Sequence, residues 1–552
     1  MKILILGAGI MQYPAIQIAK EMGLHVVVAD GNKDAQFVSY ADDFVQIDLK
    51  NKEAIADLAV NLKKGANALG GVFTAGTDFS TTVAYACEKA GLPGIPYESA
   101  LNASDKERMR RCFAVAGVPS PRFKVFRKGD ALSIASNNDS LSCTANFSYP
   151  IVVKPVDNMG GRGCRKCNSE AELRDAVISA FDFSRSGRVI AEEFMEGPEY
   201  SIDAIAYNGE ITICGIADRH IFFPPHFIEM GHTMPALLDE KTKQDLVDVF
   251  MRGVKSLGIT MGAAKGDIKL TKNSDGAYTK PAIGEIAARL SGGYMSGWTF
   301  PYSSGIEVTK AAILIAIGKS HDNLTPVLQK TSAERAFISI PGKIAAIKFK
   351  KNAENVEYVE DLFFRVEAGS KVTFPENNVS KCGNVISAAP SRKEAVDAAE
   401  KAVRTVLFEL EYPNNETENF LFGDELGCSI FPPCAFPVSR NILEQLERLP
   451  ASSLPSSANK NNQICILSFN DFEKSNIKDY LGRSIAESID AVRKITNLPL
   501  PIKIPAKEKI NLATENVNAL ECFFGKEFWH ALIRGTYQGA SYTVAKLLGG
   551  AS

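Results

Sequence analysis

Short apolar runs alternate with amphipathic stretches along residues 1–90 of this chain. The apolar runs predict β-strands, and apolar residues spaced three or four apart predict helices. The expected strands are 3–7, 26–30, 43–48 and 71–75, and the expected helices are 12–22, 52–63 and 79–90. Strands that alternate with helices predict a doubly wound parallel sheet, so this part of the chain is expected to have an α/β fold.

The first expected strand ends in the turn Gly7-Ala8-Gly9, and the second ends in Asp30. This arrangement is part of a dinucleotide-binding fingerprint, but the third glycine of that fingerprint is absent. We therefore favour an ordinary strand-to-helix turn that faces a substrate at the carboxyl edge of the sheet. Binding of NAD is the alternative interpretation.

Residues 104–195 mix helices and strands. Ser104 is expected to be the N-cap of a helix that runs to Ala116. Further along, strands are expected from near 123, at 150–155 and at 188–193, with a helix at 169–182 and a Ser- and Asn-rich surface loop at 133–148.

Two pairs of short apolar segments with polar turn residues between them predict β-hairpins. Their strands are 200–206 with 210–218, and 263–271 with 278–287. The first turn contains Asn208-Gly209, a dipeptide typical of tight hairpin turns. Helices are expected at 241–257 and 306–318.

From residue 335 the pattern changes. Short strands are expected within 344–349, 371–374 and 383–390, followed by an amphipathic helix at 391–410. Residues 411–463 show little periodic order and include a linker-like Pro- and Ser-rich stretch, whereas the end of the chain after a strand-like run at 465–469 is largely helical in pattern. The predicted fold class is therefore α/β and α+β in several domains, with an N-terminal doubly wound sheet and a C-terminal extension.

Composition and charge exclude several classes of protein. At roughly 100–200 residues per domain, a chain of 552 residues is expected to contain three or four domains. A net charge of −2 with scattered basic residues gives no attraction to nucleic acid or to a membrane surface. No apolar run reaches the roughly 18 residues of a membrane span, and the N-terminus is interpreted as a first strand and not a signal peptide. Eleven cysteines without a repeating spacing predict reduced thiols in a cytoplasmic protein.

Residues 152–164, VVKPVDNMGGRGC, carry the clearest chemical signal. An expected strand brings Lys154 to its end, and Gly160, Gly161 and Gly163 follow in a short turn. Glycines let backbone N–H groups approach a phosphate closely, and a lysine adds a positive charge. The segment therefore predicts a flexible phosphate-binding cover, with an ordinary glycine turn as the alternative.

The same region contains a C-x-x-C pair, Cys164 and Cys167. Zinc and redox sites use this spacing, but a structural zinc site needs a second pair at a suitable distance, and the sequence has none. We expect both side chains to line the return strand of the glycine-rich hairpin.

The segment EEFMEGPEYSID, residues 192–203, ends a strand in two acids and continues after a Gly-Pro turn with Glu199. Such a hinge can present backbone groups to an adenine edge, while Glu199 can accept hydrogen bonds from ribose hydroxyls. A plain acidic strand end is the alternative.

Asp267 and Glu285 lie at equal distances from residue 276 in the second hairpin, so a symmetric register places them opposite each other. Like charges there are destabilising, and a bound Mg²⁺ would relieve the repulsion because it prefers oxygen ligands. Two solvated carboxylates, or a register that separates them, are the alternatives.

Arg289 follows four residues after Glu285. Its guanidinium suits a carboxylate or a phosphoryl group, and a surface salt bridge is the alternative.

Together these segments resemble the ATP-grasp carboxylate–amine ligases, a group that includes amino-acid ligases, phosphoribosylglycinamide synthetase and carbamoyl-phosphate synthase-like proteins. The motifs, spread over residues 1–412, are DKERMR with Lys106, VVKP with Lys154, DNMGGRG, EEFMEGPE, GDIKL with Asp267, and EIAARLSGG with Glu285 and Arg289. The resemblance implies four parts: an N-terminal α/β domain at 1–103, an ATP-grasp domain at 104–330 with a lid over about 121–195, a small lobe at 331–412, and an extension of unknown role at 413–552.

The resemblance also implies roles for individual residues. The residues expected to contact ATP are Lys106, Lys154, Gly160, Gly161, Gly163, Glu192, Glu193, Phe194, Met195 and Glu199. Asp267 and Glu285 would hold Mg²⁺, with Mn²⁺ as an alternative. Lys154 and Arg289 would be catalytic, and Arg289 would face the acyl phosphate or the substrate carboxylate.

A second set of residues concerns the substrate. Glu229 and His232 lie in HFIEMGHTMPALL, residues 226–238, which resembles a loop of members that join amino acids. They would contact the amine or the carboxylate substrate, and a polar surface loop is the alternative. His220 and His226 are expected to be polar packing residues.

One departure from the family pattern concerns residue 287. The family usually has Asn two residues after the second metal acid, whereas this chain has Ala287. Alanine has no ligand atom, so a second Mg²⁺ would lose a protein oxygen, and the number of bound ions stays open.

The implied reaction uses ATP to activate a carboxylate as an acyl phosphate, which an amine then attacks to form an amide. Amino acids are the first candidate substrates. A purine-pathway or carbamoyl-phosphate-like reaction and a non-catalytic nucleotide-binding scaffold are the alternatives. The implied partners are small molecules, with neither nucleic acid nor membrane, and the sequence is compatible with a homo-oligomer.

Overall fold

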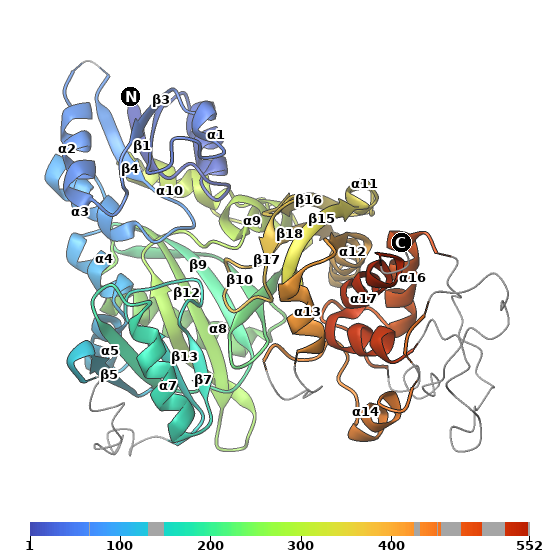
Figure 1. Ribbon diagram of the computed structural model, residues 1–552. Helices are drawn as coiled ribbons and strands as arrows, with labels where there is room; N and C mark the ends of the chain where they lie inside the picture. The colour runs from blue at the N-terminus through green and yellow to red at the C-terminus, as the bar shows by residue number, and fades with distance from the viewer. Residues whose placement is uncertain are drawn as a thin grey trace. The chain divides into compact units, whose positions relative to one another are not determined.

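The computed structural model describes residues 1–65, 67–130, 148–423, 431–449, 451–453, 476–498 and 525–549 (Figure 1). The chain divides into two compact units, Met1–Glu334 with Ala388–Val396, and Arg335–Ser387 with Asp397–Ser552. The strand expected at 465–469, the Pro- and Ser-rich stretch at 454–463 and the surface loop expected at 133–147 lie outside the described residues.

The N-terminal part of the first unit is the expected parallel α/β sheet. Its strand order is β3-β2-β1-β4, with β1 Lys2–Leu6, β2 His25–Asp30, β3 Asp43–Gln46 and β4 Leu69–Phe73. Each neighbouring pair is parallel, as strand–helix alternation predicts.

Helices cover both faces of this sheet. On one face α2 (Lys52–Leu62) and α3 (Ser80–Ala90) bury residues such as Leu4 and Val27, and on the other α1 (Tyr13–Glu21) and α10 (Val308–Ala316) bury Ile3 and Val28. Because α10 comes from the far end of the first unit, this sheet and the rest of that unit share one apolar core.

The helix expected to start at Ser104 is two helices. Ser104 is the last residue of α4 (Tyr97–Ser104), and α5 (Lys106–Val115) follows directly. The N-cap is Asp105, whose carboxylate accepts a hydrogen bond from the backbone N–H of Arg108. The extended backbone of Asp105 separates the helices and places Lys106 at the first turn of α5.

A small antiparallel sheet forms the part of the chain predicted to be a lid. Its order is β5-β8-β6-β7, with β5 Phe123–Arg127, β6 Ile151–Pro155, β7 Arg165–Cys167 and β8 Arg188–Glu193. Helix α7 (Glu170–Phe181) covers one face through an apolar cluster that includes Leu173, Val177 and Val153. Cys167 lies on β7, the return strand of the glycine hairpin, as expected.

The large sheet of the first unit has the order β13-β12-β9-β10-β11-β14. Its strands are β9 Glu199–Tyr207, β10 Glu210–Phe222, β11 Ile228–Met234, β12 Gly262–Lys272, β13 Tyr278–Ala287 and β14 Thr331–Phe337, the last of which runs into the second unit. One face packs against α8 (Glu240–Ser256) and α5 through Phe250, Phe113 and Ile286.

The segment 226–238 is mostly a strand and not a surface loop. Residues 228–234 form β11, which is antiparallel to β10, and Gly231, His232 and Thr233 are buried. The prediction missed this strand because glycine, histidine and glutamate interrupt its apolar alternation.

The remaining elements of the first unit are short. They are the 3₁₀ turns η1 (Val38–Tyr40) and η2 (Lys128–Asp130), the π-helical turn η4 (Met295–Thr299) and α9 (Phe300–Ser304). The turn η4 follows Ser291-Gly292-Gly293 directly.

The second unit combines short sheets with helices. In its sheets β15 (Gly342–Lys348) lies between β17 (Lys371–Val372) and β19 (Leu407–Leu410), and β16 (Val359–Phe364) pairs with β18 (Gly383–Ala389). The predicted end of the helix expected over 391–410 is wrong. Helix α12 (Arg392–Thr405) stops at Thr405, and the β-prone residues that follow form β19.

Helices at the end of the chain share a core with β19. They are α13 (Asn415–Phe422), α14 (Arg440–Leu446), α16 (Ile485–Thr496) and α17 (Lys526–Gly549), with the short α11 (Lys350–Glu354) earlier in the unit. Leu407, Trp529 and Leu532 belong to one buried cluster with residues of α14 and α16. Within the described segments, no helix is long and apolar enough to cross a membrane.

Candidate active site

Three adjacent strands of the large sheet expose a row of polar side chains on one face. They are Glu199, Ser201 and Asp203 on β9, Lys265, Asp267 and Lys269 on β12, and Glu285 on β13. Successive side chains alternate between the faces of a strand, so residues two apart lie on the same side. In register, Ser201 and Glu285 flank Asp267. These side chains form the floor of the candidate site.

The predicted opposition of Asp267 and Glu285 is present, because the two residues are direct partners across β12 and β13. The hairpin is not uniform, however, since two single-residue bulges lie between its turn and this pair. A uniform register continued from the Lys272–Tyr278 pair near the turn would place Ile283 opposite Asp267. The bulges therefore decide which residues face each other, and they enlarge the local twist as bulges generally do.

Glu285 is surrounded by positive charge. Its Oε1 lies 3.4 Å from Nζ of the buried Lys106. Burial by itself would raise the pKa of this carboxyl, but the charges of Lys106, Lys154, Lys265 and Arg289 lower it to about 2. Glu285 is therefore an ionised oxygen donor at every pH near neutrality.

Asp267 contacts two cations, and both contacts use the same oxygen. Its Oδ1 lies 2.9 Å from Nη1 of Arg219 and is also bonded by Nζ of Lys265. The second carboxylate oxygen, Oδ2, takes part in neither contact.

The donor set of the two opposed acids fits a hard divalent cation. Asp267 and Glu285 offer carboxylate oxygens on one face, and Mg²⁺ prefers oxygen ligands while keeping several waters and phosphate oxygens. Among the described residues no group of three acid, histidine or cysteine side chains could hold a metal ion. A metal ion here would therefore take its other ligands from the nucleotide and from water.

Lys106 is placed at the start of α5, where its ammonium group is nearly inaccessible. Its Nζ donates a hydrogen bond of 2.9 Å to the carbonyl oxygen of Asn158, the residue that begins the glycine turn. Burial acts to lower the pKa of Lys106, but Glu285, Asp78 and Glu192 raise it, so the group stays charged. The structure thus brings Lys106 to both Glu285 and the glycine turn.

Lys154 lies on β6 and is held by a buried acid. Its Nζ is 2.6 Å from Oε2 of Glu192, whose Oε1 accepts a hydrogen bond of 2.7 Å from Nε of Arg110. Arg110 in turn donates to the carbonyl oxygen of Gly284 at the bulge beside Glu285. The Glu192 side chain thus orients Lys154, while the backbone of Glu192 remains part of the strand end proposed for adenine.

Arg110 was not singled out from the sequence, although it belongs to DKERMR. It is 1% exposed, and it links α5, β8 and β13. A basic residue five positions after the helix-capping acid could have been noticed, but only its fully buried position reveals its role.

The glycine turn has the backbone conformation that only glycine adopts readily. Gly160, Gly161 and Gly163 have φ angles of 69°, 77° and 69°. A Cβ on Gly163 would stand 2.9 Å from the ring of Phe183, so the turn also packs closely on the segment after α7.

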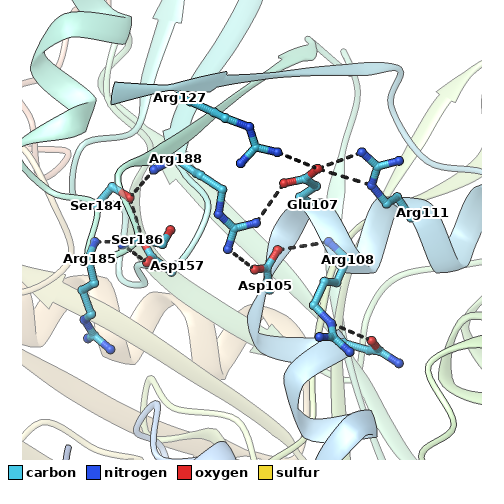
Figure 2. A network of polar contacts seen from close by, with 11 residues as sticks. Asp105, Glu107, Arg108, Arg111, Arg127, Asp157, Ser184, Arg185, Ser186 and Arg188 are labelled. Atoms are coloured by element: carbon cyan, nitrogen blue, oxygen red, sulfur yellow. Dashed lines mark hydrogen bonds and ion pairs between the residues drawn. The ribbon is translucent and has the colours of Figure 1, made fainter. Parts of the chain in front are cut away.

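An ion-pair network holds the start of α5 against the lid sheet (Figure 2). Arg188, at the start of β8, binds the carboxylates of Asp105 and Glu107, which flank Lys106. Asp157 accepts hydrogen bonds from Ser184, Arg185 and Ser186. Residues 184–188, at the end of the loop before β8 and the start of that strand, thus hold both the segment around Lys106 and the residue before the glycine turn.

The proposed adenine segment follows β8. Glu193 is bound by Arg122 at 2.8 Å, and Nζ of Lys166 and Nζ of Lys269 lie 4.2 and 5.2 Å from the centroid of the Phe194 ring. Met195 lies close enough to Gly284 that its Cε would be 3.9 Å from a Cβ there. The segment therefore adjoins the metal acids.

Arg219 on β10 joins three acids that the sequence assigned to different roles. Its guanidinium binds Glu199, Glu229 at 2.6 Å and Asp267 at 2.9 Å. Although burial alone would lower its pKa, these carboxylates raise it. Arg219 was not recognised as a site residue from the sequence. The feature that could have indicated its role is its position opposite Glu199 across the strands of the first hairpin.

The predicted substrate residues Glu229 and His232 both lie on β11. Nε2 of His232 is 3.6 Å from Oε2 of Glu229, and Nδ1 is 2.7 Å from Oε2 of the fully buried Glu334. A Cβ on Gly293 would stand 3.0 Å from Oε1 of Glu229, so the Ser-Gly-Gly turn approaches these side chains directly. His220 hydrogen-bonds Thr233 at 2.9 Å, as expected for a packing residue.

Arg289 precedes that turn. Its Nη1 donates to the carbonyl oxygen of Leu290, and its buried Nε has no hydrogen-bond partner among the described residues. The neighbouring Ser291 donates its backbone N–H to Asp203, while Ser291 Oγ is likewise unpartnered there. Arg289 therefore keeps hydrogen-bonding capacity beside Glu285, which suits an anionic ligand.

The Gly7-Ala8-Gly9 turn is held by side chains of the N-terminal domain. The Gln12 side chain accepts from the Gly9 backbone N–H and donates to the carbonyl oxygen of Ala75 at 2.5 Å. A phosphate at this turn would have to displace Gln12. Asp30 is used by the turn itself, since it accepts from the Ala8 N–H. An ordinary turn is thus the interpretation that these contacts support.

Comparison with known families places three segments of the chain. Residues 16–94 match the ATP-grasp N-terminal domain, residues 147–280 match the ATP-grasp domain, and residues 336–411 match the L-amino acid ligase C-terminal domain 2. The second match includes Lys154, the glycine turn and Asp267.

Among the curated relatives are two whose names describe the ligation of alanine. An alanine–anticapsin ligase of Bacillus subtilis strain 168 is 26% identical over 363 residues, which cover 61% of this chain and 72% of the relative. A D-alanine–D-alanine ligase of Pseudomonas entomophila is 30% identical over 218 residues, which cover 36% of this chain and 64% of the relative.

Solved structures share the fold. An L-amino acid ligase from Bacillus licheniformis has a TM-score of 0.63 at 21% identity and covers 74% of this chain and 99% of its own. A phosphoribosylglycinamide synthetase from Anaerococcus prevotii has a TM-score of 0.57 at 21% identity with the same coverage. At such identities the likeness establishes architecture, and the chemistry has to be argued from the residues.

Proposed function

Because this chain is an ATP-grasp carboxylate–amine ligase, we propose that it activates the carboxylate of one amino acid with ATP and joins it to the amino group of a second. One observation carries the proposal. Asp267 and Glu285, paired across β12 and β13, lie next to Lys106, and Lys106 also contacts the glycine turn that follows Lys154. A magnesium-bound triphosphate carries the negative charge that these lysines would neutralise and the metal ion that the two acids would hold.

The nucleotide would lie along the polar face of the large sheet. Its phosphates would meet Lys106, Lys154 and the backbone of the glycine turn, where lysine charges and oriented N–H groups favour anions. Its adenine would lie at residues 192–195, with Glu199 near the ribose. Asp267 and Glu285 would hold Mg²⁺, which supplies charge neutralisation for the transferring phosphoryl group.

The substrates would bind on the other side of the metal acids. Arg289 would face the carboxylate that reacts, because its charge lowers the pKa of Glu285 and its buried Nε has no hydrogen-bond partner among the described residues. Glu229 and His232 offer acceptors for an ammonium group at the edge of the same site. An amino acid carries both groups, so two amino acids match the charges of these side chains.

The reaction takes place in two steps. A carboxylate oxygen of the first substrate attacks the γ-phosphorus, the bond from that phosphorus to the bridging oxygen of ADP breaks, and an acyl phosphate forms. The neutral amine of the second substrate then attacks the acyl carbon, and phosphate leaves as the amide forms and the nitrogen loses a proton. Lys106, Lys154 and Arg289 stabilise the negative charge that develops on oxygen, and the rigid floor orients the reactants.

A second candidate uses the same site for a purine-pathway reaction, because a phosphoribosylglycinamide synthetase has a comparable fold. The sequence relatives favour amino acids, since their names describe ligation of alanine. We place the reaction in the cytoplasm, because no disulfide is found among the cysteines of the described residues.

The test measures ADP release by the purified protein against a panel of carboxylates and amines. Turnover with pairs of amino acids, and a dipeptide identified by mass spectrometry, is the expected result. Turnover with phosphoribosylamine and glycine, or with bicarbonate, would support the second candidate. ATP binding without turnover on any pair would contradict the proposed ligase activity.

A further inference from the structure

Lys265 lies between acids in the middle of the candidate site. On β12 it is two residues before Asp267, so both side chains project from the same face of the strand. Its direct partners in register are Asp203 on β9 and Ala287 on β13. Lys265 therefore forms the rung next to the Asp267–Glu285 pair.

The ammonium group of Lys265 is directed along the strand to the metal acids. Its Nζ bonds Oδ1 of Asp267, and the Lys265 side chain is only 14% exposed. Lys265 is thus a positive charge held against Asp267, on the rung next to the Asp267–Glu285 pair.

Ala287 is the residue that makes this arrangement possible. Directly opposed side chains on antiparallel strands have Cβ atoms about 4.5–5.5 Å apart. A methyl group at 287 leaves room for the lysine side chain and provides no oxygen for a metal ion. A divalent cation placed on this rung would meet the Lys265 ammonium, and the two positive charges would repel each other.

The acids keep ligand atoms for one cation. Lys265 and Arg219 both contact Asp267 through Oδ1, and Lys106 approaches Glu285 through Oε1. Oδ2 of Asp267 and Oε2 of Glu285 are therefore left for a metal ion between the two carboxylates. Such an ion displaces none of the three basic side chains.

Buried polar atoms next to Lys265 indicate that this rung holds polar ligands. Oγ of Ser201 and Oδ2 of Asp203 have no hydrogen-bond partner among the described residues, although both side chains are at most 1% exposed. Buried polar groups are generally hydrogen-bonded, so these atoms are expected to meet water or a ligand. Lys265 is the charge that balances Asp203 from the adjacent strand.

We propose that Lys265 takes the place of a second metal ion, so that this enzyme binds its nucleotide with a single divalent cation held between Asp267 and Glu285. The inference rests on the proposed function, because it assumes a nucleotide in this site. Lys265 contributes to the neutralisation of the triphosphate as a permanent part of the protein. The step that consumes ATP then depends on one metal-binding equilibrium.

The experiment counts Mn²⁺ ions bound to the full chain in the presence of a non-hydrolysable ATP analogue, by electron paramagnetic resonance. The wild-type protein is expected to bind one Mn²⁺ per bound nucleotide. The double variant Lys265→Met, Ala287→Asn removes the ammonium and adds an amide oxygen, and it is expected to bind two. Without metal, Lys265→Met is expected to bind the analogue about tenfold more weakly, the effect of losing one charged contact.

Lys272→Met is the matched control, since Lys272 lies on the same strand with a side chain that is 51% exposed and pairs with Glu196 outside the floor. It is expected to retain wild-type stoichiometry and affinity. Two Mn²⁺ ions on the wild-type protein would overturn this inference alone, and unchanged metal-free affinity in Lys265→Met would also contradict it. Failure of the wild-type protein to bind the analogue would overturn the proposed function together with the inference.

Discussion

At the scale of single residues, the site depends on cations that are held in place by buried acids. Glu192 binds Lys154 on one side and Arg110 on the other, and Arg219 binds three acids at once. Charges arranged in advance need little reorganisation when a triphosphate arrives. The candidate acids and Lys154 are visible in motifs, whereas Arg110, Arg219 and Lys265 are recognised only from their contacts.

Lys154→Met is expected to lower kcat/KM for ATP-dependent ligation by about 100-fold, which corresponds to about 3 kcal/mol of lost transition-state stabilisation. The methionine retains the apolar stem, and Arg110 still pairs with Glu192. Steady-state ADP release measures the effect. Lys124→Met, on β5 of the same lid sheet, serves as the control, and an unchanged rate in the Lys154 variant would contradict its role.

The raised pKa of Asp203 leads to a predicted pH dependence of stability. Burial outweighs the opposing effects of Lys265 and Ser291 and raises the pKa of Asp203 from 3.8 to about 6. The folded protein therefore binds the proton more tightly than the unfolded chain does, and stability falls as the pH rises from about 4 to about 6. The pKa difference corresponds to about 3 kcal/mol.

The variant Asp203→Asn does not show this loss of stability. The difference in unfolding free energy between the variant and the wild-type protein is therefore expected to grow in favour of the variant between pH 4 and pH 6 and then to level off. Urea unfolding followed by tryptophan fluorescence measures it. Trp298 lies in the first unit and Trp529 in the second, so a Trp529→Phe background isolates the signal of the first. Parallel stability curves for the two proteins would contradict the assignment.

At the scale of elements, the positions of bulges and helix boundaries were harder to predict than the elements themselves. Two bulges in the β12–β13 hairpin bring Asp267 opposite Glu285, and their positions leave no clear trace in the residue pattern. Asp105 caps α5 where Ser104 was expected, because both residues are good caps and only the backbone shows which one is extended. The strand β11 was missed because its polar residues are buried.

The glycine turn gives a prediction at this scale. In Gly163→Ala the new Cβ lies in a left-handed backbone conformation and meets Phe183 at 2.9 Å, so the turn is expected to be displaced. The KM for ATP is expected to rise about tenfold while the thermal unfolding temperature changes little.

Gly209→Ala is the control for this variant, since Gly209 also has a positive φ, at 84°, but a Cβ there meets nothing within 4 Å. It is expected to leave the KM for ATP unchanged. Equal effects of the two substitutions on KM would show that the contact with Phe183 is not important.

At the scale of the whole molecule, the C-terminal helices belong to the second unit. Trp529 and Leu532 on α17 are completely buried in the cluster that contains Leu407 of β19. In the same unit, Arg483 donates to the carbonyl oxygens of Val403 and Arg404 at the end of α12. Arg483 and helices α16 and α17 therefore complete the core around the segment that matches the L-amino acid ligase C-terminal domain.

Leu532→Ala is expected to destabilise the second unit by about 2–5 kcal/mol, because it leaves a cavity in this cluster. Fluorescence of Trp529 during urea unfolding reports the change, with Trp298 replaced by phenylalanine. Leu548→Ala, at a side chain that is 47% exposed on the same helix, is the control and is expected to change stability by less than about 0.5 kcal/mol. Equal effects of the two substitutions would show that α17 does not contribute to this core.

The sequence by itself determined the N-terminal parallel sheet, the two hairpins and the residue types of the nucleotide site, because local periodicity and glycine-rich turns act over a few residues. Only the tertiary structure decided which acids pair with which cations. Those pairings join β9, β10, β12 and α5, and their register depends on bulges and on burial, which arise when distant segments pack together.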